Sequence, residues 1–302
     1  MRIAIGLETD GSIDQVLERA HHLHDLGFRS VWSSQIFGPD TLTAIAVVGR
    51  ELRDMDFGTA VVPIQPRHPA MLGAQARTVQ DAIGGHLSLG IGLSHQVVVE
   101  GMWGISFDKP ATYMKEYVAA LAPILRGEAA NVHGERVTAV TMGTVGPRHV
   151  SAPSLILAAL GPVMLDLAGR EADGTCLWMT GVSTIRTHVA PRIREAAAAA
   201  GRPAPRVIAA LPIAVTNDVA AARARINETL AVYGTLPSYQ AMLEKEGAKE
   251  VADVALLGTA SEVREKLADL ADAGTTEFSA AIIGTDAERD ATIELLLDVQ
   301  KG

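Results

Sequence analysis

A glycine-rich turn followed by a titratable side chain occupies residues 89–96, Leu-Gly-Ile-Gly-Leu-Ser-His-Gln. The apolar run predicts a buried parallel strand, and Gly90 and Gly92 would let a flat or anionic ligand approach its end, because neither has a Cβ atom. His95 follows, and histidine is the side chain whose ordinary pKa lies nearest physiological pH. Glycines and a titratable group at a strand end are typical of one corner of an α/β-barrel active site. A tight turn with a surface histidine would have the same sequence.

Similar strand ends recur at the spacing of strand–helix units. The strands are expected at 1–8, 29–35, 57–63, the segment ending in the motif above, 154–159, 174–179, 206–215 and 277–282. The helices are expected at 12–26, 41–55, 69–83, 110–126, 164–168, 185–200, 263–273 and 288–299. Near-continuous apolar strands are typical of a parallel sheet covered on both faces. Eight such units predict a (β/α)8 barrel of the TIM type, and a doubly wound open sheet of six or seven strands is the alternative.

Two regions are longer than a minimal unit, residues 97–150 after the fourth strand and residues 216–258 after the seventh. Insertions after barrel strands fall on the carboxyl-end face, where substrates bind. We therefore expect at least one of them to shape a substrate cavity. The alternative is that they cover the barrel flank or build a subunit interface.

Composition favours a single cytoplasmic barrel domain over residues 1–302. The chain is 48% hydrophobic, and no apolar run approaches the roughly 20 residues of a membrane span. The first residues enter a strand directly, which leaves no room for a signal peptide. The single cysteine, Cys176, suits a reducing compartment, and the net charge of −9 argues against a nucleic-acid partner. No cluster of histidine and acidic residues has metal-ligand spacing, so no metal site is expected.

An anion site is expected where the fifth strand passes into a helix, at residues 159–164. Free backbone amides at a helix start can bind an anion, and the helix dipole supports that binding. Gly161 permits close approach, and Pro162 presets the first helical turn. A helix start that binds nothing remains the alternative.

Taken in order, several segments resemble the bacterial luciferase-like oxidoreductases, and within them most nearly the enzymes that use the deazaflavin coenzyme F420. The segments are 58–63 with Arg67-His68-Pro69, 89–96, 113–117 with 125–128, 157–164, 168–169 with 172–174, and 258–259 with 263–274. The resemblance implies a strand-three bulge with a cis peptide, by position Thr59–Ala60, and a homodimer. It implies that the anion is the cofactor phosphate, although Val163 replaces a frequent basic residue. The implied cofactor-binding residues are Thr59, Ala60, Gly92, Leu93, Ser94, Ala159, Gly161, Pro162, Val163 and Met164.

The resemblance also implies hydride transfer between the deazaflavin C5 and a substrate, with the protein supplying orientation and often a proton. Related sugar-oxidising enzymes carry an Asp-His pair where this chain has Gln35 and Ile36, and a glutamate where it has His95. His95 is therefore the candidate general acid, or else a residue that orients the cofactor. Gln35 is assigned to the catalytic site with it, and Gln35 and Glu8 are candidates for orienting substrate polar groups.

Apolar residues in the same regions favour a small apolar organic substrate over a sugar phosphate. The candidate substrate contacts, besides Glu8, are Trp103, Phe107, Trp178 and Met179. We expect an F420-dependent oxidoreductase. The alternatives are an FMN-dependent luciferase-like monooxygenase and a non-catalytic flavin-binding relative.

Overall fold

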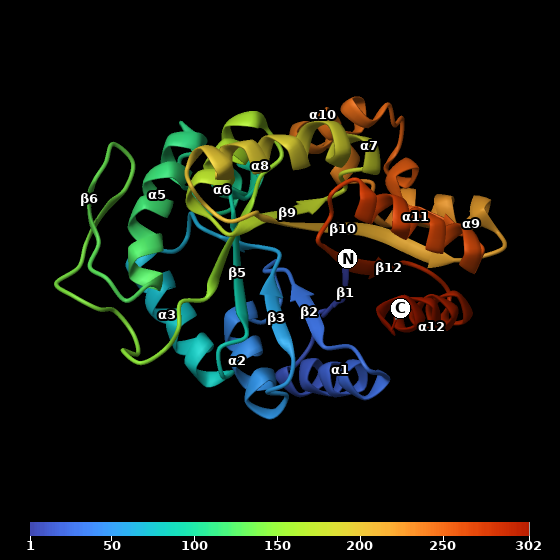
Figure 1. The fold of residues 1–302 in the computed structure, drawn as a ribbon, viewed down its shortest axis with the longest axis horizontal. Coiled ribbons are helices and arrows are strands. Elements are labelled where there is room, and N and C mark those ends of the chain that lie inside the picture. The colour runs from blue at the N-terminus through green and yellow to red at the C-terminus, as the bar shows by residue number, and fades with distance from the viewer. Residues whose placement is uncertain (302) are drawn as a thin grey trace.

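Eight parallel strands close into a barrel in the computed structural model, which describes residues 1–301 (Figure 1). The last residue of the expected 1–302 domain therefore lies outside the described part. The barrel strands are β1 (Arg2–Gly6), β2 (Ser30–Ser33), β3 (Asp56–Thr59), β5 (Leu87–Gly92), β8 (Ser154–Ala158), β9 (Gly174–Trp178), β10 (Arg206–Val215) and β12 (Glu277–Ile282). Each pairs with the next, and β12 returns to β1 with Ile3 opposite Phe278. The closed ring confirms the predicted (β/α)8 barrel and excludes the open sheet, which would leave two free edges.

Helices follow the strands and cover the outside of the ring (Figure 1). They are α1 (Ile13–Leu26), α2 (Thr41–Glu51), α3 (Pro69–Ala82), α4 (Gln96–Gly101), α5 (Pro110–Leu125), α6 (Pro162–Glu171), α7 (Val182–Thr184), the π-helical η1 (Ile185–Val189), α8 (Ala190–Ala199), α9 (Val219–Thr229), the 3-10 helices η2 (Tyr233–Thr235) and η3 (Val251–Val254), α10 (Pro237–Glu246), α11 (Ala260–Asp272) and α12 (Asp286–Lys301). Ser12 caps α1 in a reciprocal box with Gln15, and Gly27 ends it at φ 111°. Both signals were readable in the sequence. The helix expected at 41–55 ends earlier, at Glu51, and the one expected at 164–168 extends over Pro162–Glu171.

The third strand is not one continuous run over 57–63, as its apolar pattern alone had suggested, and it carries the bulge that the family resemblance implied. Gly58 lies opposite Ser88 of β5, and Val62 of the short strand β4 (Val62–Pro63) lies opposite Ile91. One strand advances four residues while its neighbour advances three, so one residue is extra. The cis peptide is Ala60–Val61, so the expectation of Thr59–Ala60 was wrong by one residue. The reason is register, because Thr59 is still paired with Ser33 of β2 and the extra residue can only follow it.

Both expected insertions are present. After β5 come α4, α5 and a small antiparallel hairpin of β6 (Asn131–His133) and β7 (Thr138–Val140). After β10 come α9, η2, α10 and η3, and then the strand β11 (Leu256–Gly258), which pairs in parallel with the end of β10. β11 was not among the strands expected from the sequence. No helix within residues 1–301 is long and apolar enough to cross a bilayer.

Buried side chains fill the barrel interior from the amino ends of its strands upward. Glu277 is 2% exposed and accepts hydrogen bonds from Ser30 at 3.0 Å and from the Trp32 indole at 2.8 Å. Arg206 pairs with the same carboxylate at 2.7 Å and donates to Ser88 at 2.8 Å. An apolar layer of Ala4, Trp32, Ile156, Cys176 and Ile208 packs together as a cluster of its own. The opposite, carboxyl end is the one on which ligands can bind.

Candidate active site

Most of the candidate residues lie at the carboxyl ends of barrel strands. Because the strands are parallel, these ends meet on one face. The segments are Glu8 after β1, Gln35 after β2, Thr59 and Ala60 at the end of β3, Gly92 to His95 at the end of β5, Ala159 to Met164 after β8, and Trp178 with Met179 at the end of β9. The fold thus brings to one face segments that are up to about 170 residues apart in sequence.

A half-buried apolar floor lies at the centre of this face. Ala60, Val61 and Ala158 pack on the apolar layer of the barrel interior and remain partly exposed. A Cβ atom on Gly92 would lie 2.7 Å from Val61 Cγ2 and 3.2 Å from Ala158 Cβ, and one on Gly90 would lie 1.8 Å from the Thr59 carbonyl oxygen. These glycines are required by the close packing of the bulge on β5. Their lack of a Cβ atom allows the bulge to pack on β5 and form the floor.

The bulge is fastened to the end of β2. The Ala60 amide donates to Ser33 O at 2.7 Å, and the Ser34 hydroxyl donates to Ala60 O at 2.6 Å. The Gln35 amide donates to Val61 O at 3.3 Å. The Gln35 side-chain oxygen accepts from the Thr41 amide at 2.8 Å, at the start of α2. Gln35 is thus fixed by its backbone amide and by its side-chain carbonyl oxygen, and its side-chain NH2 group remains available to donate a hydrogen bond to a ligand.

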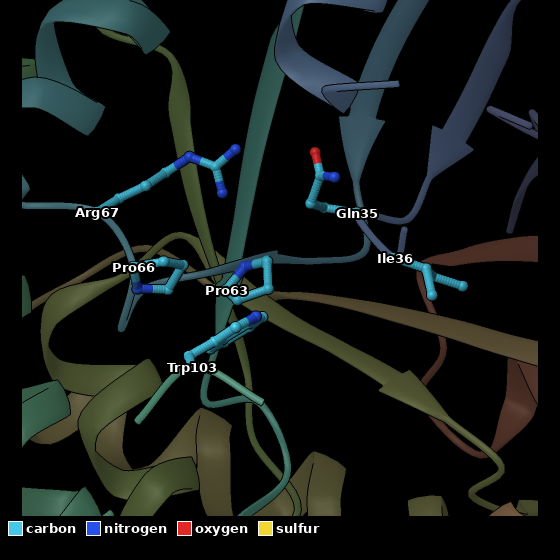
Figure 2. A pocket seen from close by; sticks show the side chains of 6 residues that line it. All are labelled: Gln35, Ile36, Pro63, Pro66, Arg67 and Trp103. Atoms are coloured by element: carbon cyan, nitrogen blue, oxygen red, sulfur yellow. The ribbon is translucent and has the colours of Figure 1, made fainter. Parts of the chain in front are cut away.

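A cavity of about 340 Å³ opens beside the floor (Figure 2). It is lined by Gln35, Ile36, Pro63, Pro66, Arg67 and Trp103. Figure 2 shows the Gln35 amide and the Arg67 guanidinium on one side and the Trp103 ring beside Pro63 on the other. Arg67 forms an ion pair with Asp40, whose carboxylate also accepts from the Thr43 amide. Burial opposes ionisation of Asp40, but these hydrogen bonds and the Arg67 charge outweigh it and lower its pKa. The structure therefore unites Gln35 and Trp103 around one cavity with an apolar base.

Aromatic side chains from three parts of the chain meet on the same face. The His95 ring lies 5.9 Å from that of Tyr239, Tyr239 lies 5.4 Å from Tyr233, and Tyr233 lies 5.7 Å from Trp178, all between centroids. The last two pairs are edge-to-face. Sequence reasoning named His95 and Trp178 but missed both tyrosines. The available signal was that two of the four tyrosines in the chain fall in the second insertion.

His95 is half-buried at the amino end of α4, where its side chain makes no capping hydrogen bond. Burial alone lowers its pKa below the ordinary 6.5, because burial disfavours the charged imidazolium. A carboxylate neighbour would have raised the pKa instead. The ring is therefore chiefly neutral at pH 7 and offers one N–H donor and one acceptor nitrogen.

The start of α6, where the sequence predicts an anion site, has no side-chain cap. Gly161 is its N-cap and supplies no capping side chain, so the first amides have no partner within the helix. A Cβ atom on Gly161 would meet nothing within 4 Å. Two basic side chains that sequence reasoning missed lie beside it: His188 bonds Leu160 O at 2.9 Å, and Arg192 donates to Pro162 O at 3.1 Å. Their signal was a basic run following the sixth strand.

Three candidates have side chains that are buried in the core and do not reach the open face. Thr59 is fully buried, and Ala159 and Met179 are 1% exposed in the main hydrophobic core, with Met179 at φ 56°. Of the other candidates, Phe107 is half-buried in the first insertion, and Glu8 and Val163 are exposed. Burial raises the pKa of the Cys176 thiol to about 12, which suits a core residue. In the part of the chain that is described, no three histidine, cysteine or acidic side chains form a metal-binding group.

Two curated relatives match most of the chain. A 5,10-methylenetetrahydromethanopterin reductase of Methanolobus tindarius is 27% identical over 216 residues, which are 70% of this chain and 65% of that protein, just under two thirds. A Mycobacterium tuberculosis protein provisionally named a coenzyme F420-dependent oxidoreductase is 28% identical over 298 residues, 89% of this chain and 80% of that one.

A solved structure has the same fold. The coenzyme F420-dependent tetrahydromethanopterin reductase of Methanopyrus kandleri superposes with a TM-score of 0.82 at 20% identity, covering 98% of this chain and 96% of that one. The sequence profile of the luciferase-like monooxygenases matches residues 1–288. This chain is a member of the luciferase-like monooxygenase family.

Proposed function

We propose that the protein is an F420-dependent oxidoreductase that transfers a hydride between the deazaflavin and a small, apolar organic substrate. The observation that carries the proposal is the spacing of the apolar floor and the α6 start. Ala158 belongs to the floor, and Gly161 caps α6 only three residues later. Three residues span at most about 10 Å. A flat ring on the floor and a phosphate joined to it can therefore be bound by one continuous segment.

The residues present fit such a cofactor. Ala60, Val61 and Ala158 form a flat, side-chain-poor surface on which a ring can lie. The amides of Val163 and Met164 would hold the phosphate, with the helix dipole supporting its charge. His188 and Arg192 lie beside this helix start, but Arg192 is paired with Asp166 at 2.8 Å, so the backbone amides and the helix dipole would carry most of the phosphate's charge. When bound, the deazaflavin supplies the hydride-carrying carbon.

His95 and Gln35 flank the floor and are the groups proposed to act on the substrate. His95 would donate a proton to the substrate as hydride arrives at an adjacent carbon. Its pKa below 6.5 means that the imidazolium is best populated in mildly acidic solution. Gln35, whose side-chain oxygen is bound by Thr41, would direct its NH2 group toward an acceptor atom of the substrate.

An FMN-dependent monooxygenase is the second candidate, favoured by the family to which the chain belongs. Its cofactor has the same two parts, a flat ring and a phosphate, so the same floor and helix start would bind it. The two functions differ in cofactor preference, which is directly measurable.

Parallel titrations with F420 and FMN, followed by cofactor fluorescence, test the proposal. We expect micromolar or tighter affinity for F420 and weaker affinity for FMN, and the reverse order would support the second function. Gly161→Val should keep the fold, because its φ of −84° suits any residue and a Cβ meets nothing within 4 Å. It should weaken cofactor binding about tenfold through lost amide–phosphate hydrogen bonds. Ala198→Val on the exposed side of α8 is the matched control. Unchanged affinity in Gly161→Val would refute the phosphate site.

A further inference from the structure

The second insertion adds two tyrosines to a series of aromatic rings that starts at the carboxyl ends of β5 and β9. We define the aromatic wall as His95, Trp178, Tyr233 and Tyr239. The rings form a continuous series with centroid distances of 5.9, 5.4 and 5.7 Å. All four residues are half-buried, so each is partly accessible. A series of accessible rings beside a candidate active site is a surface on which a flat molecule packs well.

The wall is held in place by one carboxylate. Glu246, at the end of α10, accepts hydrogen bonds from the Ser183 amide at 3.0 Å, the Thr184 amide at 2.7 Å and the Thr184 hydroxyl at 2.6 Å. A Cβ atom on Gly181 would lie 2.2 Å from the Glu246 carboxyl carbon, so the loop and the carboxylate are in close contact. Figure 1 shows α10 and α7 side by side. The carboxylate thereby joins the insertion to the loop that follows Trp178, and the tyrosines are fixed relative to the barrel.

The wall carries hydrogen-bond donors that have no acceptor. The Trp178 indole nitrogen is buried without a partner, and within residues 1–301 neither the Tyr233 nor the Tyr239 hydroxyl has a hydrogen-bond partner. Burial raises the pKa of Tyr239 far above 10, so its phenol remains a donor at all ordinary pH values. Of these donors only the Trp178 nitrogen is a buried atom, and a buried polar group without a partner needs an explanation. The two tyrosine hydroxyls are not among the buried unpartnered atoms, so they can be reached from solvent.

The wall has no charged group of its own at neutral pH. Burial alone lowers the pKa of His95, and burial is the main cause that raises the pKa of Tyr239, with smaller contributions from the neighbouring Tyr233 and Cys176. No Asp, Glu, Lys or Arg side chain contributes to either shift. Flat rings, donors without acceptors and the lack of charge together define the complementary ligand.

We propose that the aromatic wall is the substrate subsite and that it takes a flat, uncharged ring compound bearing a carbonyl oxygen, which accepts a hydrogen bond from Tyr239. This proposal rests on the proposed function, which makes one of the two bound molecules a substrate. A flavin-type cofactor ring also carries carbonyl oxygens, so the experiment must distinguish binding of the substrate from binding of the cofactor ring.

Chromone and naphthalene form the probe pair, because both are flat two-ring compounds and only chromone has a carbonyl oxygen. Ligand-observed NMR gives the affinity of each for the chain without added cofactor. We expect Tyr239→Phe to weaken chromone binding about three- to tenfold, as loss of one neutral hydrogen bond implies, and to leave naphthalene unchanged. Tyr233→Phe reports on the second phenol. Tyr113→Phe on α5, whose ring faces Tyr117 at 6.0 Å, is the control.

Cofactor titrations of the same variants complete the test. An unchanged F420 and FMN affinity in Tyr239→Phe, with weakened chromone binding, supports a substrate subsite. A loss of cofactor affinity with unchanged chromone binding assigns the wall to the cofactor ring and overturns the proposal. Equal affinity of chromone for wild type and Tyr239→Phe also overturns it. If wild type binds neither cofactor, the proposed function fails while the chromone result still stands for the wall.

Discussion

The Thr59 hydroxyl and the backbone of Gly90 are bound reciprocally: the hydroxyl donates to Gly90 O at 2.7 Å and accepts from Gly90 N at 2.8 Å. This pair lies where β3 and β5 part at the bulge, so one side chain replaces two ladder hydrogen bonds. Both residues lie below the floor formed by Ala60 and Val61. The floor is thus supported by a buried hydroxyl.

Thr59→Val should destabilise the fold, because it leaves the buried Gly90 amide and carbonyl without partners. We expect a loss of about 2–4 kcal/mol in the free energy of unfolding. Urea denaturation followed by circular dichroism measures it. Thr59→Ser retains the hydroxyl and should lose much less. Little loss in Thr59→Val together with a large loss in Thr59→Ser would show that the methyl group, not the hydroxyl, matters.

His95 should make stability depend on pH. Burial lowers its pKa in the folded protein below 6.5, whereas the unfolded chain retains about that value. Below pH 6.5 the unfolded chain therefore binds more protons, and stability falls as the pH drops until the folded-state pKa is also passed. His95→Gln should remove this contribution to the slope below pH 6.5. An identical slope in wild type and variant would contradict the assignment.

The turnover rate should depend on the ionisation of His95 if this residue donates a proton. The rate should rise as the pH falls through its lowered pKa, and His95→Gln should abolish this rise and slow turnover about 10²–10⁴-fold. Steady-state rates from pH 5 to 8 with saturating cofactor provide the measurement. Near-normal turnover in His95→Gln would leave His95 as an orienting residue only.

Arg77 should be a principal support of the first insertion. It is 1% exposed, donates to Leu125 O at 2.6 Å and also bonds Pro147 O. Arg77→Met keeps the apolar stem but leaves two carbonyl oxygens without their donor, with an expected loss of about 2–4 kcal/mol. Chemical denaturation checks this, and Arg77→Lys should recover part of the loss. A midpoint equal to wild type in Arg77→Met would show that water replaces the guanidinium.

Cys176 should resist thiol reagents while the protein is folded. Burial raises its pKa to about 12, so the reactive thiolate is scarce at pH 8. Labelling with a chromogenic disulfide should be slow in buffer and rapid in denaturant. Rapid labelling of the folded chain would indicate that the barrel interior opens readily.

Strands were predicted best where a local run of apolar residues is enough to define the strand and pairing with neighbouring strands does not change its bounds. The seventh and eighth barrel strands occupy 206–215 and 277–282 as expected, because each is an apolar run that a parallel sheet covers on both faces. The apolar pattern alone suggested a continuous third strand, and only the family resemblance implied its bulge. Its extra residue is fixed by pairing with Ser33 on one side and Ile91 on the other, and neither neighbour is visible in a local window.

The candidate site likewise contains residues that could be predicted from the sequence and residues that could not. Strand ends such as Gly92 and His95 followed from the barrel, because every parallel strand ends on the same face. Tyr233 and Tyr239 could not be found, since their approach to Trp178 depends on the path of an insertion that Glu246 fixes through a contact 62 residues away. Their contacts with Trp178 arise only when the chain is folded, and no local sequence motif indicates them.

The polar cluster of Glu277 and Arg206 fills the barrel interior at the amino ends of its strands, so the floor faces the carboxyl end only. These side chains, with Ser30, Trp32 and Ser88, occupy the interior at the amino ends of the strands. Under the proposed function, two ligands stacked above Ala60 and Ala158 would both have to enter from the carboxyl-end face, and the inner ligand would have to bind first. Compulsory-order kinetics, in which excess of the outer ligand slows exchange of the inner one, would then be expected.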